Sequence, residues 1–275
     1  MEKTLSNLTI LYITDSVLEP YLAGRCRELL EKSAMGKRIV SVSQKPLDFG
    51  DNVCVGDIGR VALSIDIQIK AGLEVVDTPY VAVAEHDCVY APEHFDFEPP
   101  EEDREIFWYN INCWLAQYYN PNWPELDGQF SKFPGRRVQS QMICWADMFR
   151  DVTDRKIKIL SDPGYQKKFP VQSRVGEPGT NYPSRSRKVF RRDPKLQHLW
   201  RQVKDYINIC GAKDWQTKIP NIDVRHAANF TGPRRGKQRT YELPYWGTLE
   251  DVMLRPFNGQ RQDKSASSIQ WTKGE

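Results

Sequence analysis

Apolar residues in the first third of the chain follow two spacings, one typical of buried strands and one typical of helices. Residues 8–13 (LTILYI) form a continuous apolar run of strand length. Residues 21–34 have apolar positions at helical spacing, and Gly36 lies where such a helix would stop. Residues 37–44 (KRIVSVSQ) return to a strand pattern. The chain therefore begins with a predicted strand, helix and strand.

Residues 61–76 (VALSIDIQIKAGLEVV) fit both spacings. We predict a helix, because the next run, PYVAVA at 79–84, reads as a strand, and consecutive parallel strands need a crossover between them. The run 79–84 is then the third and central strand.

This β-α-β-α-β order over residues 8–84 predicts an α/β fold with an open, mostly parallel, Rossmann-like central sheet and helices on both faces. In such sheets ligands bind beyond the carboxyl ends of the strands. The tripeptides TDS (14–16) and EHD (85–87) follow predicted strands at such ends. We therefore expect both tripeptides at the ligand edge of the sheet.

The rest of the chain has weaker patterns. They predict strand alternation at 106–119, a helix at 140–152, a loop at 174–192, one helix at 194–209 and a short strand at 222–224. We expect one domain over 1–233, with a nucleotide-binding half at 1–98 and an acceptor half at 99–233. A basic C-terminal extension would follow at 234–275.

The net charge of +3 conceals a marked asymmetry along the chain. Residues 1–150 contain 14 Lys and Arg against 23 Asp and Glu, a net charge of −9. Residues 151–275 contain 25 against 13, a net charge of +12. A basic half beside an acidic one indicates contact with something anionic, such as phosphate groups, nucleic acid or an acidic partner. A solvated basic surface would give the same charges.

Several classes of protein are disfavoured by what the sequence lacks. Its six cysteines are scattered without a CxxC pair, which argues against a disulfide framework or a structural zinc site. It has no P-loop, G-x-G-x-x-G, H-E-x-x-H or G-x-S-x-G motif. No apolar stretch approaches the roughly 20 residues of a membrane span, and no secretory signal is recognisable. We expect no membrane span and a cytoplasmic location, the host cytoplasm if the protein is viral.

Glu85 and Asp87 are alternate residues at the tip of the central strand. In an extended segment, alternate side chains point to the same face. Two converging carboxylates would hold Mg²⁺ or Mn²⁺ together with the phosphates of a ligand. A solvated turn after a strand would show the same residues.

The segment NIDVRHAANFTGPRRGK (221–237) supplies groups that could complete such a site. His226 can ligate a metal through its neutral imidazole. Arg225, Arg234 and Arg235 can neutralise a diphosphate, and Asn229 is a further candidate for binding it. A purely structural histidine is the competing interpretation.

Together these segments resemble the GT-A-fold, metal-dependent glycosyltransferases that use nucleotide sugars. The resemblance covers residues 8–232 and rests on ILYITDS (10–16), LEVVDTPYVAVAEHDCVY (73–90) and VRHAANFTG (224–232). It implies a nucleoside-diphosphate sugar, with a UDP-sugar favoured, as donor, and Mn²⁺ or Mg²⁺ as cofactor. In that family an Asp-x-Asp signature after a central strand binds the cation, and a late histidine often completes its shell.

Carried over to this chain, the signature falls on Glu85 and Asp87, and the late histidine on His226. Glu in place of the first Asp is a departure, and its longer side chain implies contact with ribose or with a metal-bound water. Thr14 and Asp15 match positions that usually contact the nucleotide base.

Four further residues are candidates for the donor site or for the catalytic base. Gln44 and Arg60 are weaker candidates for the donor site, because they lie at the second strand end and just before the next helix. An inverting enzyme also needs a carboxylate base, which in this family often lies at the start of a later helix. Asp147 is the expected base, and Asp151 is the alternative.

The acceptor and two competing functions stay open at this point. The basic half would suit a polyanion, for example hydroxymethylated bases in DNA, which some viral enzymes glycosylate, or a phosphorylated glycan. A nucleotidyltransferase would use the same type of sheet and metal, but normally has a glycine-rich basic loop after the first strand. A non-catalytic nucleic-acid-binding protein would explain the basic half, but not the acidic strand tip.

Overall fold

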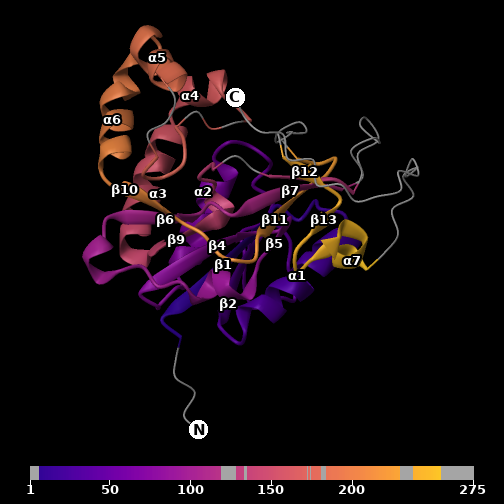
Figure 1. The fold of residues 1–275 in the computed structure, drawn as a ribbon. Coiled ribbons are helices and arrows are strands. Elements are labelled where there is room, and N and C mark those ends of the chain that lie inside the picture. Colours follow the sequence, from indigo (N-terminus) through magenta and orange to yellow (C-terminus); the bar gives the residue numbers. More distant parts are fainter. Residues whose placement is uncertain are drawn as a thin grey trace.

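The described part of the chain is arranged around one large sheet and one smaller sheet. In this computed structural model the structure describes residues 6–118, 128–132, 135–171, 173, 175–180, 184–229 and 238–254, without the side chains of 184–187. The figures show the same part of the chain in colour (Figure 1).

Seven strands of the described chain form the large sheet, in the order β10-β6-β9-β4-β1-β2-β3. Six of them run in one direction, and β9 is antiparallel to both of its neighbours. The strands are β1 (Leu8–Thr14), β2 (Arg38–Ser43), β3 (Asp51–Cys54), β4 (Tyr80–Glu85), β6 (Ile106–Asn110), β9 (Met142–Trp145) and β10 (Gly211–Trp215). The predicted open, mostly parallel central sheet is confirmed.

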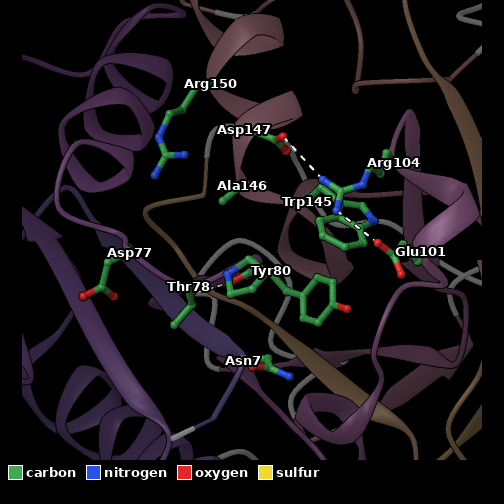
Figure 2. Close-up of a pocket in the computed structure, with 11 residues that line it drawn as sticks. Asn7, Asp77, Thr78, Tyr80, Glu101, Arg104, Trp145, Ala146, Asp147 and Arg150 are labelled. Carbon is green, nitrogen blue, oxygen red and sulfur yellow. Dashed lines mark hydrogen bonds and ion pairs between the residues drawn. The ribbon is translucent and has the colours of Figure 1, made fainter.

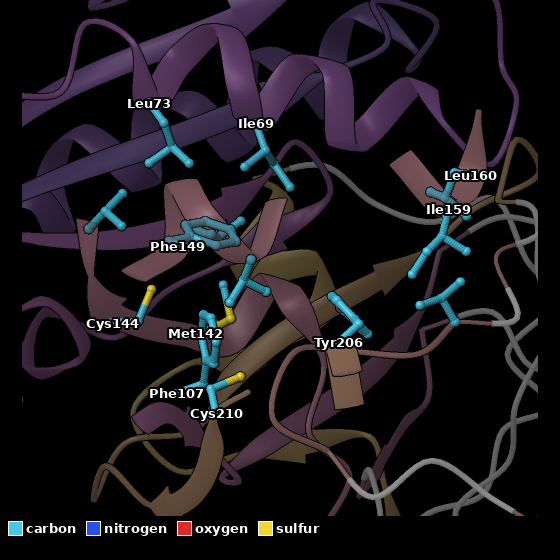
Figure 3. Packing of buried hydrophobic residues seen from close by; sticks show 14 of the residues in the cluster. Ile69, Leu73, Phe107, Met142, Cys144, Phe149, Ile159, Leu160, Tyr206 and Cys210 are labelled. Atoms are coloured by element: carbon cyan, nitrogen blue, oxygen red, sulfur yellow. The ribbon is translucent and has the colours of Figure 1, made fainter. Parts of the chain in front are cut away.

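Helices cover both faces of this sheet, as predicted. In β1, Leu11 and Ile13 face one core cluster with α2, while Ile10 and Tyr12 face another with α1. The first face is also covered by α3 and α6, and Figure 3 shows side chains of α2 and α3 meeting those of β6 and β9 there. The helices are α1 (Pro20–Ala34), α2 (Ser64–Leu73), α3 (Ala146–Leu160), α4 (Pro163–Lys168), α5 (Ser184–Arg192), α6 (Trp200–Asn208) and α7 (Leu249–Met253).

A second sheet lies beyond the carboxyl edge of the first. Its described strands have the order β12-β8-β7-β11-β5. They are β5 (Cys88–Val89), β7 (Cys113–Gln117), β8 (Phe130–Lys132), β11 (Asn221–Arg225) and β12 (Arg239–Thr240); β13 (Glu242–Leu243) and β14 (Gly247–Thr248) form a separate hairpin. Each of β4, β6 and β10 leads along the chain into a strand of this second sheet, respectively β5, β7 and β11. The carboxyl edge is therefore the junction of the two sheets.

Three predicted elements differ from the structure. The helix predicted at 140–152 is a 3₁₀ turn, η4 (Gln139–Gln141), then strand β9 and only then α3. All four residues of β9 are buried, and a short strand covered on both faces has no alternation that would distinguish it from a helix. The loop predicted at 174–192 contains α5, and the single helix predicted at 194–209 is η5 (Gln197–Leu199) followed by α6.

Two predicted elements agree closely with the structure. The ambiguous run 61–76 contains helix α2, and the short strand predicted at 222–224 is β11. Two further 3₁₀ turns, η1 (Pro92–Asp96) and η2 (Glu101–Asp103), lie between β5 and β6.

Part of the segment expected as a C-terminal extension belongs to the folded body. Strand β12 pairs with β8, and α7 packs beside α1 (Figure 1). The hydroxyl of Tyr21 in α1 donates to the carbonyl of Met253 at 2.7 Å, and Arg25 Nε donates to the carbonyl of Val252 at 2.7 Å. Helix α7, at the end of this segment, is thus held against the first helix. None of the helices that the structure describes is long and apolar enough to cross a membrane.

The contact of α2 with the sheet leaves no room for a side chain at Gly72. A Cβ there would overlap Leu11 Cδ1 and lie 2.7 Å from Val42 Cγ2. We expect Gly72→Ala to lower the free energy of unfolding by about 1–3 kcal/mol, because both neighbours belong to a packed core. Gly24 is the matched control: it lies in α1 with no atom within 4 Å of its missing Cβ, so Gly24→Ala should raise stability by up to about 1 kcal/mol. Urea unfolding gives the free energy of unfolding of each variant. Equal free energies of unfolding for the two variants would contradict the close packing of α2 on the sheet.

Candidate functional site

The central strand ends in a turn, not in an extended tip. Strand β4 stops at Glu85, His86 and Asp87 form a turn, and β5 then enters the second sheet. The amide of Val224 in β11 donates to the carbonyl of Asp87 at 2.8 Å. The alternation that would place Glu85 and Asp87 on one face therefore ends at Glu85.

The turn places three metal-ligating side chains together. Among the residues that the structure describes, His86, Asp87 and His226 each offer one ligand atom, and these atoms all lie within 4.8 Å of one another. His226 Nε2 is 3.4 Å from Asp87 Oδ2, and the side chains of both are over nine-tenths buried. The structure thus brings Asp87 and His226 together, and it adds His86, which the sequence patterns had not singled out.

Asn229 fixes Asp87 and His226 relative to one another. Its amide nitrogen donates to Asp87 Oδ2 at 2.9 Å, and its amide oxygen accepts the backbone N–H of His226 at 2.6 Å. The backbone N–H of Ala228 donates to His226 Nδ1 at 3.2 Å. Since Nδ1 accepts this bond, the proton of the neutral ring lies on Nε2, the nitrogen that faces Asp87.

Thr14 and Asp15, at the end of β1, hold His86. The Thr14 hydroxyl lies 2.9 Å from His86 Nδ1, and Asp15 Oδ1 lies 3.5 Å from the same nitrogen. A carboxylate near Nδ1 favours the proton on that nitrogen, which leaves the lone pair of Nε2 for a ligand. Thr14 and Asp15 were expected to contact the nucleotide base. In the structure their side chains instead contact His86.

Arg60 connects the first strand end to the late segment. Its Nε is 2.7 Å from Asp15 Oδ2, and its other end donates to the carbonyl of Ala228 at 2.8 Å. Gln44 supports the loop before α2, because its amide donates to the carbonyl of Gly59 at 2.8 Å. Both residues lie at the edge where the sequence placed them.

Gln68 also contributes to this edge without having been predicted. Its amide nitrogen donates to the carbonyls of Thr14 at 2.7 Å and of Val42 at 3.2 Å. These carbonyls belong to the ends of β1 and β2, so Gln68 anchors the start of α2 to both strands. Nothing in the sequence distinguishes this glutamine from a solvent-facing one.

Glu85 and Arg225 lie at the same edge but outside the group of three ligands. Burial raises the pKa of Glu85 well above its ordinary value, and the nearby charges of Asp87 and Asp223 raise it further, against the opposing effect of Arg225. Arg225 Nη1 is 3.5 Å from Asp223 Oδ1. In the described part of the chain, this edge therefore combines several carboxylates with the largely buried guanidinium of Arg225.

The pKa shifts of the metal-ligating groups favour ligation. Burial opposes ionisation of Asp87, but contact with His226, the charge of His86 and the bond from Asn229 outweigh it and hold the pKa of Asp87 below its ordinary value. Burial lowers the pKa of His86, against the opposing charges of Asp87 and Asp15. A carboxylate and a neutral imidazole are the forms that bind cations.

Asp147, expected as the base, is not brought to this edge. It lies in the first turn of α3, exposed, with Arg104 Nη1 3.9 Å away. Because β9 runs antiparallel to β4, α3 begins beside Tyr80, at the amino end of the central strand. A base must reach the acceptor hydroxyl, so this placement does not support the expected role.

Asp147 instead lines a separate pocket of about 500 Å³ (Figure 2). The Arg104 guanidinium lies 4.0 Å from the centre of the Trp145 ring. Figure 2 shows the two side chains next to each other in this pocket. Asp151, the alternative base, lies on α3 in an ion pair with Arg155 at 3.0 Å. Arg234 lies outside the described residues.

Comparison with known proteins does not assign this chain to a family. No family model and no curated protein matches this chain. The bifunctional IspDF from Campylobacter jejuni has a TM-score of 0.34 and 14% identity over 57% of this chain, and the match spans 45% of that protein, less than half of its length.

Two other solved structures are similar at the same level. A glycosyltransferase involved in the glycosylation of the major capsid of PBCV-1 has a TM-score of 0.39 and 9% identity, covering 82% of this chain and 94% of that one. HddC from Yersinia pseudotuberculosis has a TM-score of 0.32 and 10% identity, covering 52% and 79%. At these values no argument about function rests on any of the three.

The donor set itself shows which cation would fit. Two imidazoles and one carboxylate suit Mn²⁺ and later transition metals, whereas Mg²⁺ prefers oxygen ligands alone. A cation takes the lone pair of His226 Nε2 only after the proton has left this nitrogen, so binding must release a proton or open the Ala228 contact. The residues present therefore fit a divalent cation whose binding weakens at low pH.

We expect Mn²⁺ to raise the melting temperature of the protein more than Mg²⁺ does at equal concentration.

His86→Ala and His226→Ala should each weaken Mn²⁺ affinity at least about tenfold, because each removes one ligand. The affinity of the native chain should also be lower at about pH 5.5 than at about pH 7.5, since protons compete with the cation for the ligand atoms. Differential scanning fluorimetry gives the melting temperatures, and calorimetric titration gives the Mn²⁺ affinities.

The control variant is His198→Ala, which removes an exposed histidine paired with Asp162 at 2.7 Å. It should leave the Mn²⁺ affinity unchanged. Equal Mn²⁺ affinities for the native chain and His226→Ala would remove this residue from the site.

Proposed function

We propose that this protein is a metal-dependent glycosyltransferase. It would transfer a sugar from a nucleoside-diphosphate sugar, most simply a UDP-sugar, to a hydroxyl group. One observation supports this above others: His86, Asp87 and His226 meet at the carboxyl edge of a mostly parallel sheet, where ligands of such folds bind. The resemblance of the strand tip and of the late segment to this family supports the same conclusion.

Asp87, His86 and His226 would hold the cation, which when bound would neutralise charge on the diphosphate leaving group. Arg225 adds a buried positive charge at the same edge. Asn229 keeps the Asp87 carboxylate and the His226 backbone in place through its two bonds. The two hydrogen bonds of Asn229 thus fix Asp87 and the backbone of His226 before the donor arrives, which limits the ordering cost during transfer.

The pair of Arg60 and Asp15 would position the donor at the end of β1. Arg60 bridges Asp15 and the carbonyl of Ala228, so it ties the end of β1 to the segment that carries His226. A nucleotide bound beside this bridge would contact both the end of β1 and the segment that follows β11. This is how the expected donor role of Thr14, Asp15 and Arg60 fits their observed contacts.

For the acceptor we propose an anionic molecule, with hydroxymethylated DNA as the first candidate. The support is the net charge of +12 over residues 151–275, calculated from 25 basic and 13 acidic residues. Binding of this kind should weaken steeply as salt concentration rises.

Ligand-dependent stabilisation separates this function from its competitors. A UDP-sugar with Mn²⁺ should raise the melting temperature, since a ligand at about 100 times its Kd stabilises the native state by about 2.7 kcal/mol. Stabilisation by NTP with Mg²⁺, but not by nucleotide sugars, would indicate a nucleotidyltransferase. Stabilisation by DNA alone would indicate a binding protein.

Asp87→Asn tests the site directly. We expect it to reduce turnover of the best nucleotide sugar by about 100-fold or more, because the charge that holds the cation is lost, while the fold is retained. Release of nucleoside diphosphate measures turnover, and circular dichroism measures the fold. Asp48→Asn, which changes an exposed aspartate on the loop after β2, is the matched control. Full activity of Asp87→Asn would contradict the proposed function.

A further inference from the structure

Exposed positive charge gathers on three helices at one end of the molecule. Helices α4, α5 and α6 lie together there, next to α3 (Figure 1). We call residues 163–208, which contain these three helices, the basic lobe. The basic lobe has 11 Lys and Arg against 3 Asp and Glu, a net charge of +8. Two thirds of the net charge of +12 in the second half of the chain therefore lies in this lobe.

An apolar interior fixes the direction in which these charges point. Phe190 of α5 is fully buried and stacks on Tyr165 of α4, with 5.9 Å between the ring centres. Val203 and Tyr206 of α6 belong to the same core cluster. The exposed basic residues are Lys188, Arg191 and Arg192 on α5, and Arg201 and Lys204 on α6. Because they are three or four residues apart, the basic residues of each helix share one outward face.

Most of these charges are not neutralised within the described chain. Elsewhere in it, exposed lysines are often ion-paired, as Lys32 is with Glu28 and Lys70 with Asp154. In the basic lobe, Lys168 pairs with Asp193. The other basic side chains that the structure describes in the lobe form no ion pair with a described residue; they are Lys167, Lys188, Arg191, Arg192, Lys195, Arg201 and Lys204. Like charges at this spacing repel one another, and an anionic partner would relieve the repulsion.

The chemistry of this surface fits a phosphate backbone better than an acidic protein. The core of a protein–protein interface is apolar, whereas contacts with phosphate are made by Arg, Lys and other polar groups. Among the described residues, none of the large apolar side chains that are exposed lies on α5 or α6. The charges also spread along two helices and do not converge on one point. This arrangement suits DNA, which carries about one negative charge per 1.7 Å of its axis.

A duplex held on the basic lobe is also long enough to extend to the candidate donor site. About 15 base pairs span about 50 Å, at about 3.4 Å for each base pair. The diameter of a folded chain of this length is about the same. Binding at one end of the molecule is therefore compatible with a reaction at the carboxyl edge of the sheet.

We propose that the basic lobe is a docking surface for the phosphate backbone of duplex DNA. The outward faces of α5 and α6 contact phosphates, so this binding is independent of base sequence and sensitive to salt. The inference rests on the proposed function in its choice of DNA as the polyanion. It concerns binding alone, so unmodified DNA tests it without any sugar transfer.

The test compares two double variants that lose the same charge. One combines Arg192→Gln with Lys204→Gln, which removes a basic side chain from each helix of the lobe. The control combines Lys32→Gln with Lys218→Gln, which removes two exposed lysines outside the lobe. Fluorescence anisotropy of a labelled, unmodified duplex of about 30 base pairs gives the Kd of the full chain between about 50 and 300 mM NaCl.

We expect the lobe variant to bind the duplex at least about tenfold more weakly than the native chain at about 100 mM NaCl. The slope of log K against log [NaCl] should become shallower by about 1.8, because each phosphate contact contributes about 0.9. The control should bind within about twofold of the native chain. Circular dichroism shows whether each variant is folded.

The outcomes separate this inference from the proposed function. Equal affinities of the two double variants would overturn the inference and leave the proposed function standing. A native chain that does not bind the duplex at about 50 mM NaCl would also overturn it, and turnover of a nucleotide sugar with Mn²⁺ would then decide the proposed function separately. DNA binding that is weakened in the lobe variant, in a native chain without turnover, would support the inference and contradict the proposed function.

Two further results are decisive. A polyglutamate peptide that binds as tightly as the duplex, with the same loss in the lobe variant, would indicate an acidic protein partner and overturn the inference. If the lobe variant does not fold, the single variants Arg192→Gln and Lys204→Gln replace it. Each should make the salt slope shallower by about 0.9, and unchanged slopes for both would overturn the inference.

Discussion

The candidate site depends on the join between the two sheets. The amide of Val224 bonds to the carbonyl of Asp87, and β5 pairs with β11 beside it. These main-chain bonds place His226, which follows β11, against the turn that follows β4. Backbone groups buried at such a junction must be paired, so the ladder that satisfies them also sets the position of the imidazole. Without it, the two residues would belong to separate elements with no fixed relation.

The carboxyl edge concentrates charges that most proteins keep in water. Asp87 is ionised there because His86, His226 and Asn229 compensate for its burial, whereas burial and its acidic neighbours raise the pKa of Glu85. Burying charges without full compensation costs stability, and such costs are characteristic of binding and catalytic sites. A bound cation and an anionic ligand would complete the compensation. The charges at this edge therefore favour the binding of a cation together with an anionic ligand.

Local pattern identified most of the first half of the fold. The choice of a helix for 61–76 held because the sheet needed a crossover at that point, although periodicity alone permitted a strand. Periodicity gave the wrong element at 140–152, since Met142–Trp145 is buried on both faces and shows no strand alternation. The Arg- and Lys-rich stretch that became α5 resembled a loop, because most of its side chains are polar and helix propensity is a weak guide.

The order of residues along the chain established that acidic groups follow a central strand and that an imidazole follows a later one, because strand length and spacing are local properties. Which groups face each other was decided by the folded chain. Because His86 and Asp87 form a turn, Asp87 lies near His86 and His226, and Glu85 lies outside this group of ligands. The reversed direction of β9 placed Asp147 at the opposite edge of the sheet, although it directly follows a strand end in the sequence. Strand direction and loop anchoring arise from contacts between distant segments, and no local pattern encodes them.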